Sequence, residues 1–457
     1  MAKNEQMILG QDARSLALAI LARVLDRRRP LEDVLADPDL ANALGHDERE
    51  RRYALNLVRT TLRHLGQIDD VLAHFVKEPL PPSSGSASHI LRIALADLLF
   101  LKTESYAAVN SAVELAARDN KARHFRGLLN AVLRRAANEG NVFLLDQRLE
   151  DVLLPGWLTM GWRRAYGEEM ASQILKAHLA EPPLDITLKP GLERAEWGAR
   201  LEAQVLPTGS LRRTGGGPVA ALAGFEEGAW WVQDAAAALP ARLFGNVRGQ
   251  TIIDLCAAPG GKTAWLAASG AHVLAVEKAD ARAARLAENL ERLKLQAQIV
   301  VADARDFSPE APADAVLLDA PCSSTGTIRR HPDIPWIKEA DDIRALTMLQ
   351  SELLAAAFAM IKPGGTLVYS VCSLEPAEGE EAIGRFLHAQ SDAQRAPIQS
   401  REISGVANFI TAAGDLRTLP SQWAELGGLD GFYAARIVKR GARANNAAAP
   451  NHTVSGV

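Results

Sequence analysis

The chain is poor in cysteine, with only Cys256, Cys322 and Cys372 among its 457 residues. These residues lie far apart and form no Cys-x-x-Cys pair. This spacing excludes a disulfide framework and a zinc site built on several cysteines. We therefore expect a protein of the reducing cytoplasm that holds no metal ion.

Long hydrophobic runs and an excess of charge of one sign are also lacking. No stretch approaches the roughly 18 uninterrupted apolar residues of a membrane helix, and the N-terminus opens no signal peptide, so we expect no membrane partner. The formal net charge of -4 argues against a wholly basic nucleic-acid coat protein. A local basic face can still bind a phosphate backbone. The length allows about two to four domains.

Hydrophobic periodicity divides the chain into four regions. Residues 1–140 predict a compact all-helical domain, and residues 141–225 predict a small α+β connector. In residues 226–440 strands alternate with helices, which predicts an α/β domain with a doubly wound parallel sheet. The tail, residues 441–457, predicts disorder. In the α/β region we expect strands at 251–255, 273–277, 299–302, 315–319 and 366–371, and helices at 262–269, 280–294, 341–361 and 377–389.

The segment Asp254–Thr263 follows a predicted strand and opens a predicted helix. Gly260 and Gly261 allow the backbone to approach a ligand closely, and the free N–H groups of the helix N-terminus lie beside them. The Gly-Gly-Lys-Thr sequence is similar to a P-loop, but Cys256 stands where that motif requires glycine. The segment therefore predicts a ligand-binding loop of another kind.

Acidic residues mark the ends of three further strands, at Glu277, Asp303 and Asp319. In a doubly wound sheet, Glu277 would offer its carboxylate to ribose hydroxyls, and Asp303 would reach an adenine amino group. The set therefore indicates an adenosine-bearing cofactor. The competing interpretation is that these acids only cap the helices that follow.

Two of the cysteines lie in motifs just after predicted strands, Cys322 in Asp319–Gly326 and Cys372 in Tyr369–Leu374. A thiolate that adds to carbon 6 of a pyrimidine makes carbon 5 reactive toward a methyl donor, and a base must then remove the carbon-5 proton. Asp319, if protonated, could donate to ring N3. The alternatives are that each cysteine is a small buried hydrophobe and that Asp319 is structural. The residues alone do not decide which cysteine is the nucleophile.

These motifs resemble the signature blocks of RNA cytosine-C5 methyltransferases that use S-adenosylmethionine. The resemblance spans about residues 226–440 and is carried by Asp254–Thr263, Asp319–Gly326, Ser370–Ser373, Trp231–Asp234, Arg329–Trp336 and Leu429–Tyr433. It implies that Cys372 is the nucleophile and that Cys322 assists proton removal and product release. It also implies S-adenosylmethionine as the cofactor, with contacts from Cys256, Ala257, Ala258, Pro259, Gly260, Gly261, Lys262, Glu277, Asp303 and Asp319.

The N-terminal region resembles the NusB fold over His89–Ala94, Ala108–Ala116 and Gly127–Arg134. A NusB-like domain joined to a Rossmann-like methyltransferase domain is similar to the RsmB type, which implies 16S ribosomal RNA as the partner, and we expect a monomer. The chain departs from the family at Leu184–Lys189, where an Arg-x-Asn patch is common, and at Val371, where Thr commonly precedes the cysteine. Competing hypotheses are a non-catalytic RNA-binding or antitermination factor, and a cytosine-C5 methyltransferase of a different rRNA or tRNA site.

Basic clusters offer candidate contacts to RNA phosphates, with solvated surface as the alternative. The pair Arg329-Arg330 beside the Pro-Cys loop is the one we expect to contact RNA. Trp336 would either stack on a base or pack in the core. The target cytosine would lie in a loop or flip out of a helix. The other basic residues are Arg59, Arg63, Arg118, Lys121, Arg123, Arg126, Arg134, Arg135, Arg163, Arg164, Arg212 and Arg213.

Overall fold

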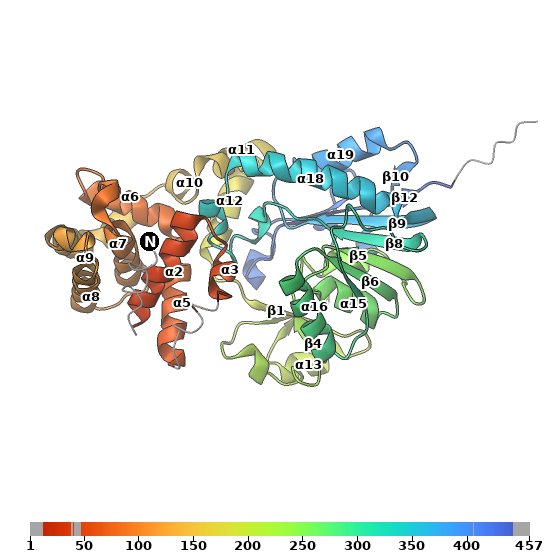
Figure 1. Ribbon diagram of the computed structural model, residues 1–457, viewed down its shortest axis with the longest axis horizontal. Coiled ribbons are helices and arrows are strands. Elements are labelled where there is room, and N and C mark those ends of the chain that lie inside the picture. Colours follow the sequence, from red (N-terminus) through yellow and green to blue (C-terminus); the bar gives the residue numbers. More distant parts are fainter. Residues whose placement is uncertain (1–11, 38–39, 41–46, 405, 442–457) are drawn as a thin grey trace, which may run out of the picture.

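The computed structural model describes residues 12–37, 40, 47–404 and 406–441, and Figure 1 labels its elements. The N-terminal region is all-helical, as predicted, and its helices pack around an apolar cluster that includes Leu21, Leu57, Ile90 and Leu133. The predicted disordered tail lies outside the described residues, apart from Gly441. The elements are α2 (Ala13–Arg27), α3 (Leu31–Leu35), α5 (Glu48–Arg63), α6 (Leu65–Phe75), η1 (Pro82–Ser84), α7 (Ala87–Leu95), the π-helical turn η2 (Ala96–Phe100), α8 (Ser105–Arg118), η3 (Ala122–Phe125) and α9 (Arg126–Asp146).

An α+β segment follows, in agreement with the prediction for the connector. Three helices lead into a four-stranded antiparallel sheet with the order β2-β3-β1-β4. Its strand β4, Trp230–Val232, lies beyond residue 225, where we expected the connector to end. A buried ion pair between Arg212 and Asp185, at 2.7 Å, joins β3 to β1. The elements are α10 (Leu149–Val152), α11 (Gly156–Tyr166), α12 (Glu168–Leu179), β1 (Leu184–Leu188), α13 (Arg194–Arg200), β2 (Gln204–Val205), β3 (Leu211–Arg213), η4 (Val219–Ala221) and β4 (Trp230–Val232).

The C-terminal region is a Rossmann-like sheet with the order β10-β12-β9-β8-β5-β6-β7, and β11 pairs with β12. The five predicted strands are all present and run parallel. The prediction of a wholly parallel sheet is wrong at one edge, because β12 begins beside the end of β9 and runs against it. The strands are β5 (Thr251–Leu255), β6 (His272–Glu277), β7 (Gln298–Val301), β8 (Ala313–Asp319), β9 (Ile361–Val371), β10 (Ala393–Arg395), β11 (Leu416–Thr418) and β12 (Phe432–Lys439).

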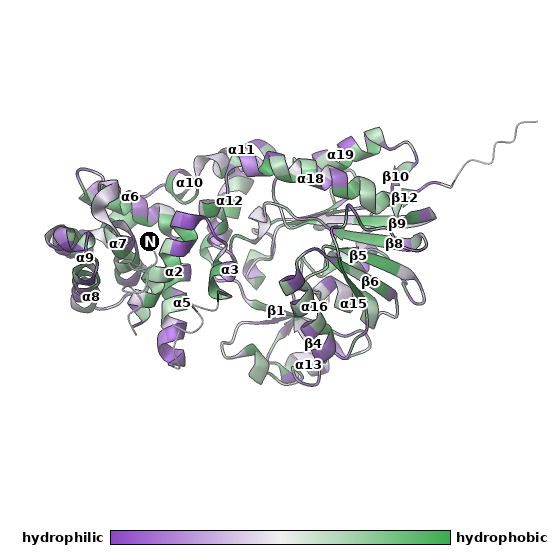
Figure 2. Ribbon diagram, in the orientation of Figure 1, coloured by the Kyte–Doolittle hydropathy of each residue, from purple (hydrophilic) through white to green (hydrophobic). Residues whose placement is uncertain are grey.

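Helices cover both faces of this sheet (Figure 1). Successive residues of β5 belong to different apolar clusters, because side chains of a strand alternate between the two faces of a sheet. Ile253 shares a cluster with Leu354 of α18, and Ile252 shares one with Leu266 of α15. Figure 2 accordingly shows hydrophobic strands between helices that carry hydrophilic residues as well. The helices and turns are α14 (Leu239–Arg242), α15 (Gly261–Ala268), α16 (Asp280–Arg292), η5 (Thr325–Thr327), α17 (Ile334–Ile337), α18 (Ala340–Ala359), α19 (Glu380–Ala389), η6 (Ser400–Ile403), η7 (Ala407–Phe409) and η8 (Ala424–Leu426).

The segment around α17 holds the helical region against the sheet region. The backbone N–H of Leu31 donates to Asp333 at 2.9 Å, and the indole N–H of Trp336 donates to the Leu62 carbonyl at 2.9 Å. Ile337 joins the apolar cluster of the N-terminal helices. Of the two roles weighed for Trp336, packing is therefore the one observed. No helix within the described ranges is both long and apolar enough to cross a membrane.

Candidate active site

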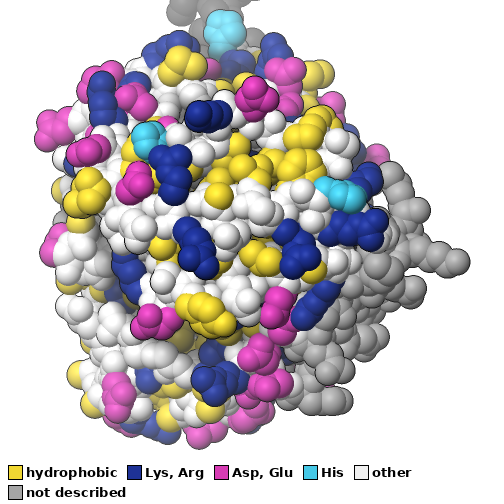
Figure 3. Space-filling view, turned by 90° about the vertical axis from the view of Figure 1, so that its left-hand side faces the viewer, with side chains coloured by type: hydrophobic (Ala, Val, Ile, Leu, Met, Phe, Trp, Pro, Cys, Tyr) yellow, Lys and Arg dark blue, Asp and Glu magenta, His cyan; other side chains and the backbone are white. Residues whose placement is uncertain are grey.

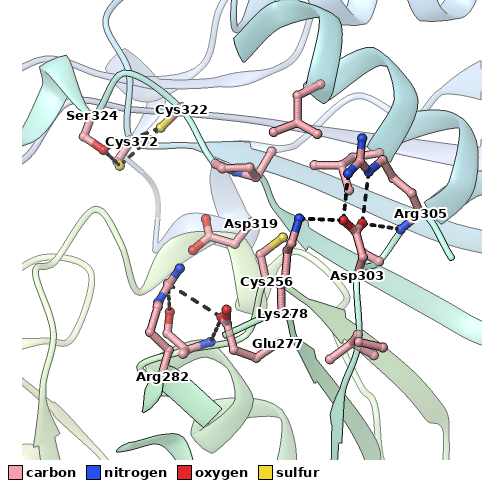
Figure 4. A pocket seen from close by; sticks show the side chains of 18 residues that line it. Cys256, Glu277, Lys278, Arg282, Asp303, Arg305, Asp319, Cys322, Ser324 and Cys372 are labelled. Carbon is pink, nitrogen blue, oxygen red and sulfur yellow. Dashed lines mark hydrogen bonds and ion pairs between the residues drawn. The ribbon is translucent and has the colours of Figure 1, made fainter. Parts of the chain in front are cut away.

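A cavity of about 500 Å³ lies at the carboxyl ends of β5, β6, β8 and β9. Ligands of doubly wound sheets bind at this edge. Figure 4 shows two sulfur atoms at one end of the cavity and the carboxylates of Glu277 and Asp303 at the other. Of the predicted site residues, Cys256, Ala258, Glu277, Asp303, Asp319, Cys322 and Cys372 line the cavity, whereas Ala257, Pro259, Gly260, Gly261 and Lys262 are not among its lining residues.

The two cysteines converge at what we call the sulfur end of the cavity, formed by Cys322, Ser324 and Cys372. Strands β8 and β9 are neighbours with Asp319 paired to Ser370, so the two loops that follow them meet. The sulfur atoms of Cys322 and Cys372 lie 3.5 Å apart. Ser324 Oγ lies 3.4 Å from the Cys372 sulfur. The sequence reading did not single out Ser324, which sits in the predicted loop.

The environments of the two thiols are unequal. The contact with Cys322 lowers the pKa of the Cys372 thiol, and Ser324 and the Lys262 ammonium act in the same direction. The same contact, together with burial, raises the pKa of Cys322. The pair therefore favours a thiolate at Cys372 beside a protonated Cys322, and a thiolate is the form that attacks carbon.

Asp319 lies between the two ends of the cavity and forms an ion pair with Lys262 at 2.7 Å. Ser370 Oγ donates to its other carboxylate oxygen at 2.8 Å. Asp319 lines the cavity, and its donation to ring N3 stays a prediction.

The glycine loop joins β5 to α15, and its residues Cys256 and Ala258 line the cavity. Gly260 adopts a φ of 103°, a conformation that favours glycine, and α15 begins at Gly261. The N–H of Ala258 donates to Glu277 Oε2 at 3.3 Å. Burial raises the pKa of Cys256 to about 12, so this third thiol stays protonated at neutral pH.

The opposite part of the cavity, which we call the carboxylate end, is built on Glu277 and Asp303. Asp303 accepts from Lys278 at 2.9 Å and from the Arg305 side chain at 2.7 and 3.0 Å. Arg305 holds the pKa of Asp303 well below its usual range. Glu277 is buried, and Arg282 lies 3.7 Å from it. The sequence analysis did not predict that basic side chains pair with these acids, although Lys278 directly follows Glu277 in the chain.

The expectation that Arg329 and Arg330 contact RNA is wrong for Arg329. Its guanidinium is fully buried and bonds Asp430 at 2.8 Å and Asp234 at 2.9 Å. Arg330 binds the same two carboxylates and is only slightly exposed. A guanidinium held between buried carboxylates is not free to bind phosphate. Local sequence does not reveal this, because Asp234 and Asp430 are far from the pair in the chain.

Several of the described basic residues on the N-terminal helices are bonded to neighbouring side chains. Arg118 pairs with Asp12, Arg135 pairs with Glu139, and the Arg134 side chain bonds Asn130. Figure 3 shows this end of the molecule, where dark blue basic side chains are separated by acidic, hydrophobic and uncharged ones. These residues stay candidate phosphate contacts.

The cavity fits an adenosine-bearing sulfonium cofactor. Two acceptor carboxylates at the ends of β6 and just beyond β7 suit ribose hydroxyls and an adenine amino group. Val276, Leu349 and Leu353 add apolar wall for a flat ring. The fold and the site together define a Rossmann-like methyltransferase that uses S-adenosylmethionine.

Comparisons with known proteins narrow this class. The family model for the 16S rRNA methyltransferase RsmB/F matches residues 242–438, and that for the NusB family matches residues 11–138. Ribosomal RNA small subunit methyltransferase B of Cronobacter sakazakii is 34% identical over 443 residues, covering 93% of this chain and 98% of that protein. The protein of the same name from Vibrio vulnificus is 34% identical over 94% of this chain and 100% of its own length. The chain belongs to the family of ribosomal RNA small subunit methyltransferases B.

Solved structures share the architecture. The crystal structure of PH0851 has a TM-score of 0.74 at 25% identity and covers 93% of this chain and 99% of that chain. NSun6 from Pyrococcus horikoshii, crystallised with SFG, has a TM-score of 0.54 at 20% identity and covers 62% of this chain and 98% of that chain. The second likeness concerns the fold alone.

Proposed function

We propose that the protein methylates carbon 5 of a cytosine in ribosomal RNA. The observation that carries this proposal is the 3.5 Å separation of the Cys322 and Cys372 sulfur atoms at the cavity that Asp319 also lines. Methyl transfer to an oxygen or an amino nitrogen needs no thiol. Carbon 5 of a pyrimidine needs one group that adds to the ring and a second that removes a proton. Two thiols at one cavity meet both needs.

Cys372 is the nucleophile in this proposal, because it is the thiol whose environment favours the thiolate. Its sulfur forms a bond to carbon 6, and the electron pair of the 5,6 double bond moves toward carbon 5 and the N3 side of the ring. Asp319, which lines the cavity and bonds the Lys262 ammonium at 2.7 Å, would in its protonated form donate to ring N3 and balance that charge.

S-adenosylmethionine supplies an electrophilic methyl group when it is bound. Glu277 would accept hydrogen bonds from the ribose hydroxyls and Asp303 from the adenine amino group. The glycine loop, Cys256 to Gly261, positions Glu277 through the N–H of Ala258. The residues of this loop would also contact the cofactor, together with Lys262 and Asp319.

Cys322 removes the carbon-5 proton in the last step. Once Cys372 is bonded to carbon 6, the neighbouring sulfur no longer carries the charge that raises the pKa of Cys322. The Cys322 proton then passes to solvent, and the resulting thiolate takes the proton from carbon 5. The electron pair of that C–H bond restores the 5,6 double bond and expels the Cys372 thiolate.

The proposed substrate is 16S ribosomal RNA, because the matched family and the relatives above carry small-subunit rRNA in their names. Within it, cytosine 967 is the position expected for the RsmB type. The base would have to leave its helical stack to reach the cavity. We further propose that the protein acts as a monomer in the cytoplasm.

In the direct test, the protein is incubated with methyl-labelled S-adenosylmethionine and with 16S rRNA from a strain that lacks this protein. Nucleoside analysis should find the label in 5-methylcytidine, and bisulfite mapping should place it at one position. Label in N4-methylcytidine or a ribose methyl group would contradict the proposal. Transfer to tRNA in preference to 16S rRNA would favour another target, and absence of S-adenosylmethionine binding would favour a non-catalytic RNA-binding factor.

A further inference from the structure

A buried carboxylate joins the two cysteine loops. Ser323, which directly follows Cys322, donates to Glu378 through its backbone N–H at 2.9 Å and its hydroxyl at 2.5 Å. Ser373, which directly follows Cys372, donates to the same carboxylate at 2.5 Å. Glu378 therefore binds the residue next to each sulfur.

Glu378 is itself fixed from two further elements. Gln350 of α18 donates to Glu378 Oε1 at 3.0 Å and to the carbonyl of Pro321 at 2.9 Å. The hydroxyl of Tyr369 in β9 donates to the Glu378 carbonyl at 2.7 Å. Glu378 is thus bonded to β9, to α18 and to the loops that follow β8 and β9.

This arrangement is costly for stability alone. Glu378, Gln350 and Ser373 are each 0% exposed. The donors to the carboxylate are neutral hydroxyl, amide and backbone groups. Removing a carboxylate from water is unfavourable, and neutral donors offset that cost less fully than a cation does. A charge kept under those conditions calls for a role that an apolar side chain cannot fill.

We propose that Glu378 is a positioning residue that ties the Cys322 loop to the Cys372 loop and thereby holds the two sulfur atoms in register for addition and elimination. The proposal rests on the cysteine chemistry proposed above. It goes beyond that chemistry because Glu378 lines no part of the cavity and contacts the two loops through Ser323 and Ser373.

The negative charge of Glu378 also bears on which thiol ionises. It is one of the influences that raise the pKa of Cys322, behind the contact with Cys372 and burial. Replacing Glu378 by glutamine keeps the shape and removes the charge. Cys322 should then compete better for ionisation.

The test labels the whole enzyme with iodoacetamide at neutral pH and quantifies modification of each cysteine by mass spectrometry. Cys256 serves as the internal monitor of unfolding, because its thiol is mostly buried and its pKa is raised to about 12. In Glu378→Gln, the ratio of Cys322 to Cys372 labelling should rise about tenfold. kcat for RNA methylation should fall about 100-fold, as expected for sub-ångström to ångström misplacement. KM for S-adenosylmethionine should stay within about twofold of the parent value.

Two matched variants distinguish the effect of the charge of Glu378 from the effect of its side-chain length and from a general effect of removing a nearby charge. Glu378→Asp keeps the charge and shortens the side chain, so it should preserve the labelling ratio while kcat falls about tenfold. Glu381→Gln removes a charge three residues further along the chain, in α19, at a residue whose side chain is 61% exposed, and it should change neither quantity. An unchanged ratio and kcat in Glu378→Gln, or the same change in Glu381→Gln, would overturn the proposal.

Should Cys256 become labelled in Glu378→Gln, the variant has unfolded and Ser373→Ala takes its place. That variant removes one contact to the carboxylate, and its kcat should fall with Cys256 still unlabelled; an unchanged kcat would overturn the proposal. Cysteine labelling needs no RNA, so the labelling ratio tests the role of Glu378 independently of methyl transfer. A parent enzyme that makes no 5-methylcytidine would refute the proposed function, whereas a parent that makes it and a Glu378→Gln variant that behaves like it would refute only the role of Glu378.

Discussion

The two ends of the cavity are held in different ways. At the sulfur end, the cysteines are fixed by buried neighbours, with Ser323 and Ser373 bound to Glu378. At the carboxylate end, Glu277 and Asp303 face basic side chains that reach solvent: Lys278, Arg282 and Arg305 are 70%, 58% and 38% exposed. The sulfur end is held by buried contacts, and the carboxylate end is covered by exposed side chains that a ligand can displace.

This difference indicates a division of labour. A covalent step requires reacting atoms held to within a fraction of an ångström, which rigid buried contacts provide. A cofactor that binds and leaves in every cycle is better served by exposed ion pairs, which contribute little to stability and exchange readily. Mutations at the sulfur end should therefore change kcat, and mutations at the carboxylate end should change cofactor affinity.

The largest effect is expected for Cys372→Ala at the sulfur end. Without the nucleophile, carbon 5 is not activated, and turnover should fall by a factor on the order of 10⁴ or more. Binding of S-adenosylmethionine, measured by calorimetry, should stay unchanged. Retained turnover would show that Cys372 is not the nucleophile.

Cys322→Ala should have the next largest effect, with turnover lower by about 100-fold or more, the usual contribution of a general base. Addition to carbon 6 still occurs, so a covalent protein–RNA complex should accumulate and appear as a shifted band on a denaturing gel. The band should be absent from the Cys322→Ala, Cys372→Ala double variant. A clean gel for the single variant would argue against the role of Cys322 in release.

Glu277→Gln tests the carboxylate end. Loss of a charged acceptor should weaken S-adenosylmethionine binding by about 10- to 100-fold, which corresponds to the loss of a hydrogen bond to a charged group. kcat at saturating cofactor should stay within about threefold of the parent value. A large fall in kcat with unchanged affinity would break the proposed division between the two ends.

Ser324→Ala should have the smallest effect, and the effect should depend on pH. Ser324 is one of the groups that lower the pKa of Cys372, so its removal should raise that pKa and reduce the thiolate fraction at neutral pH. The rate should fall by less than about tenfold at neutral pH and recover as the pH rises above the thiol pKa. A loss that is equal at all pH values would show that Ser324 acts in another way.

The sequence predicted the elements of the main sheet well because their hydrophobic patterns are local. Strand β5 was predicted with the bounds observed, and the meeting of Cys322 and Cys372 followed from their positions after two strands of one parallel sheet. The strands β10, β11 and β12 were not predicted at all, and the antiparallel direction of β12 depends on where the chain re-enters the sheet. The residues of β12 show no pattern that distinguishes the two directions.

The site was less predictable where burial and pairing are decided at long range. Arg329 stands in a run of basic residues typical of a surface, yet it is enclosed by Asp234 and Asp430. Glu378 lies in a hydrophilic stretch that reads as the exposed start of a helix, yet it is fully buried against Ser323 and Ser373. In both cases the partners lie tens of residues away or on another element, except for Ser373.

The most direct measurement uses an RNA substrate with 5-fluorocytosine at the target position. Fluorine replaces the proton that Cys322 would remove, so the reaction should stop after methyl transfer with the enzyme bonded to carbon 6. Protease digestion and mass spectrometry should find the nucleotide on the peptide that contains Cys372. A nucleotide on the peptide that contains Cys322, or steady production of 5-methylcytidine from normal RNA with no adduct from the fluorinated RNA, would contradict the account.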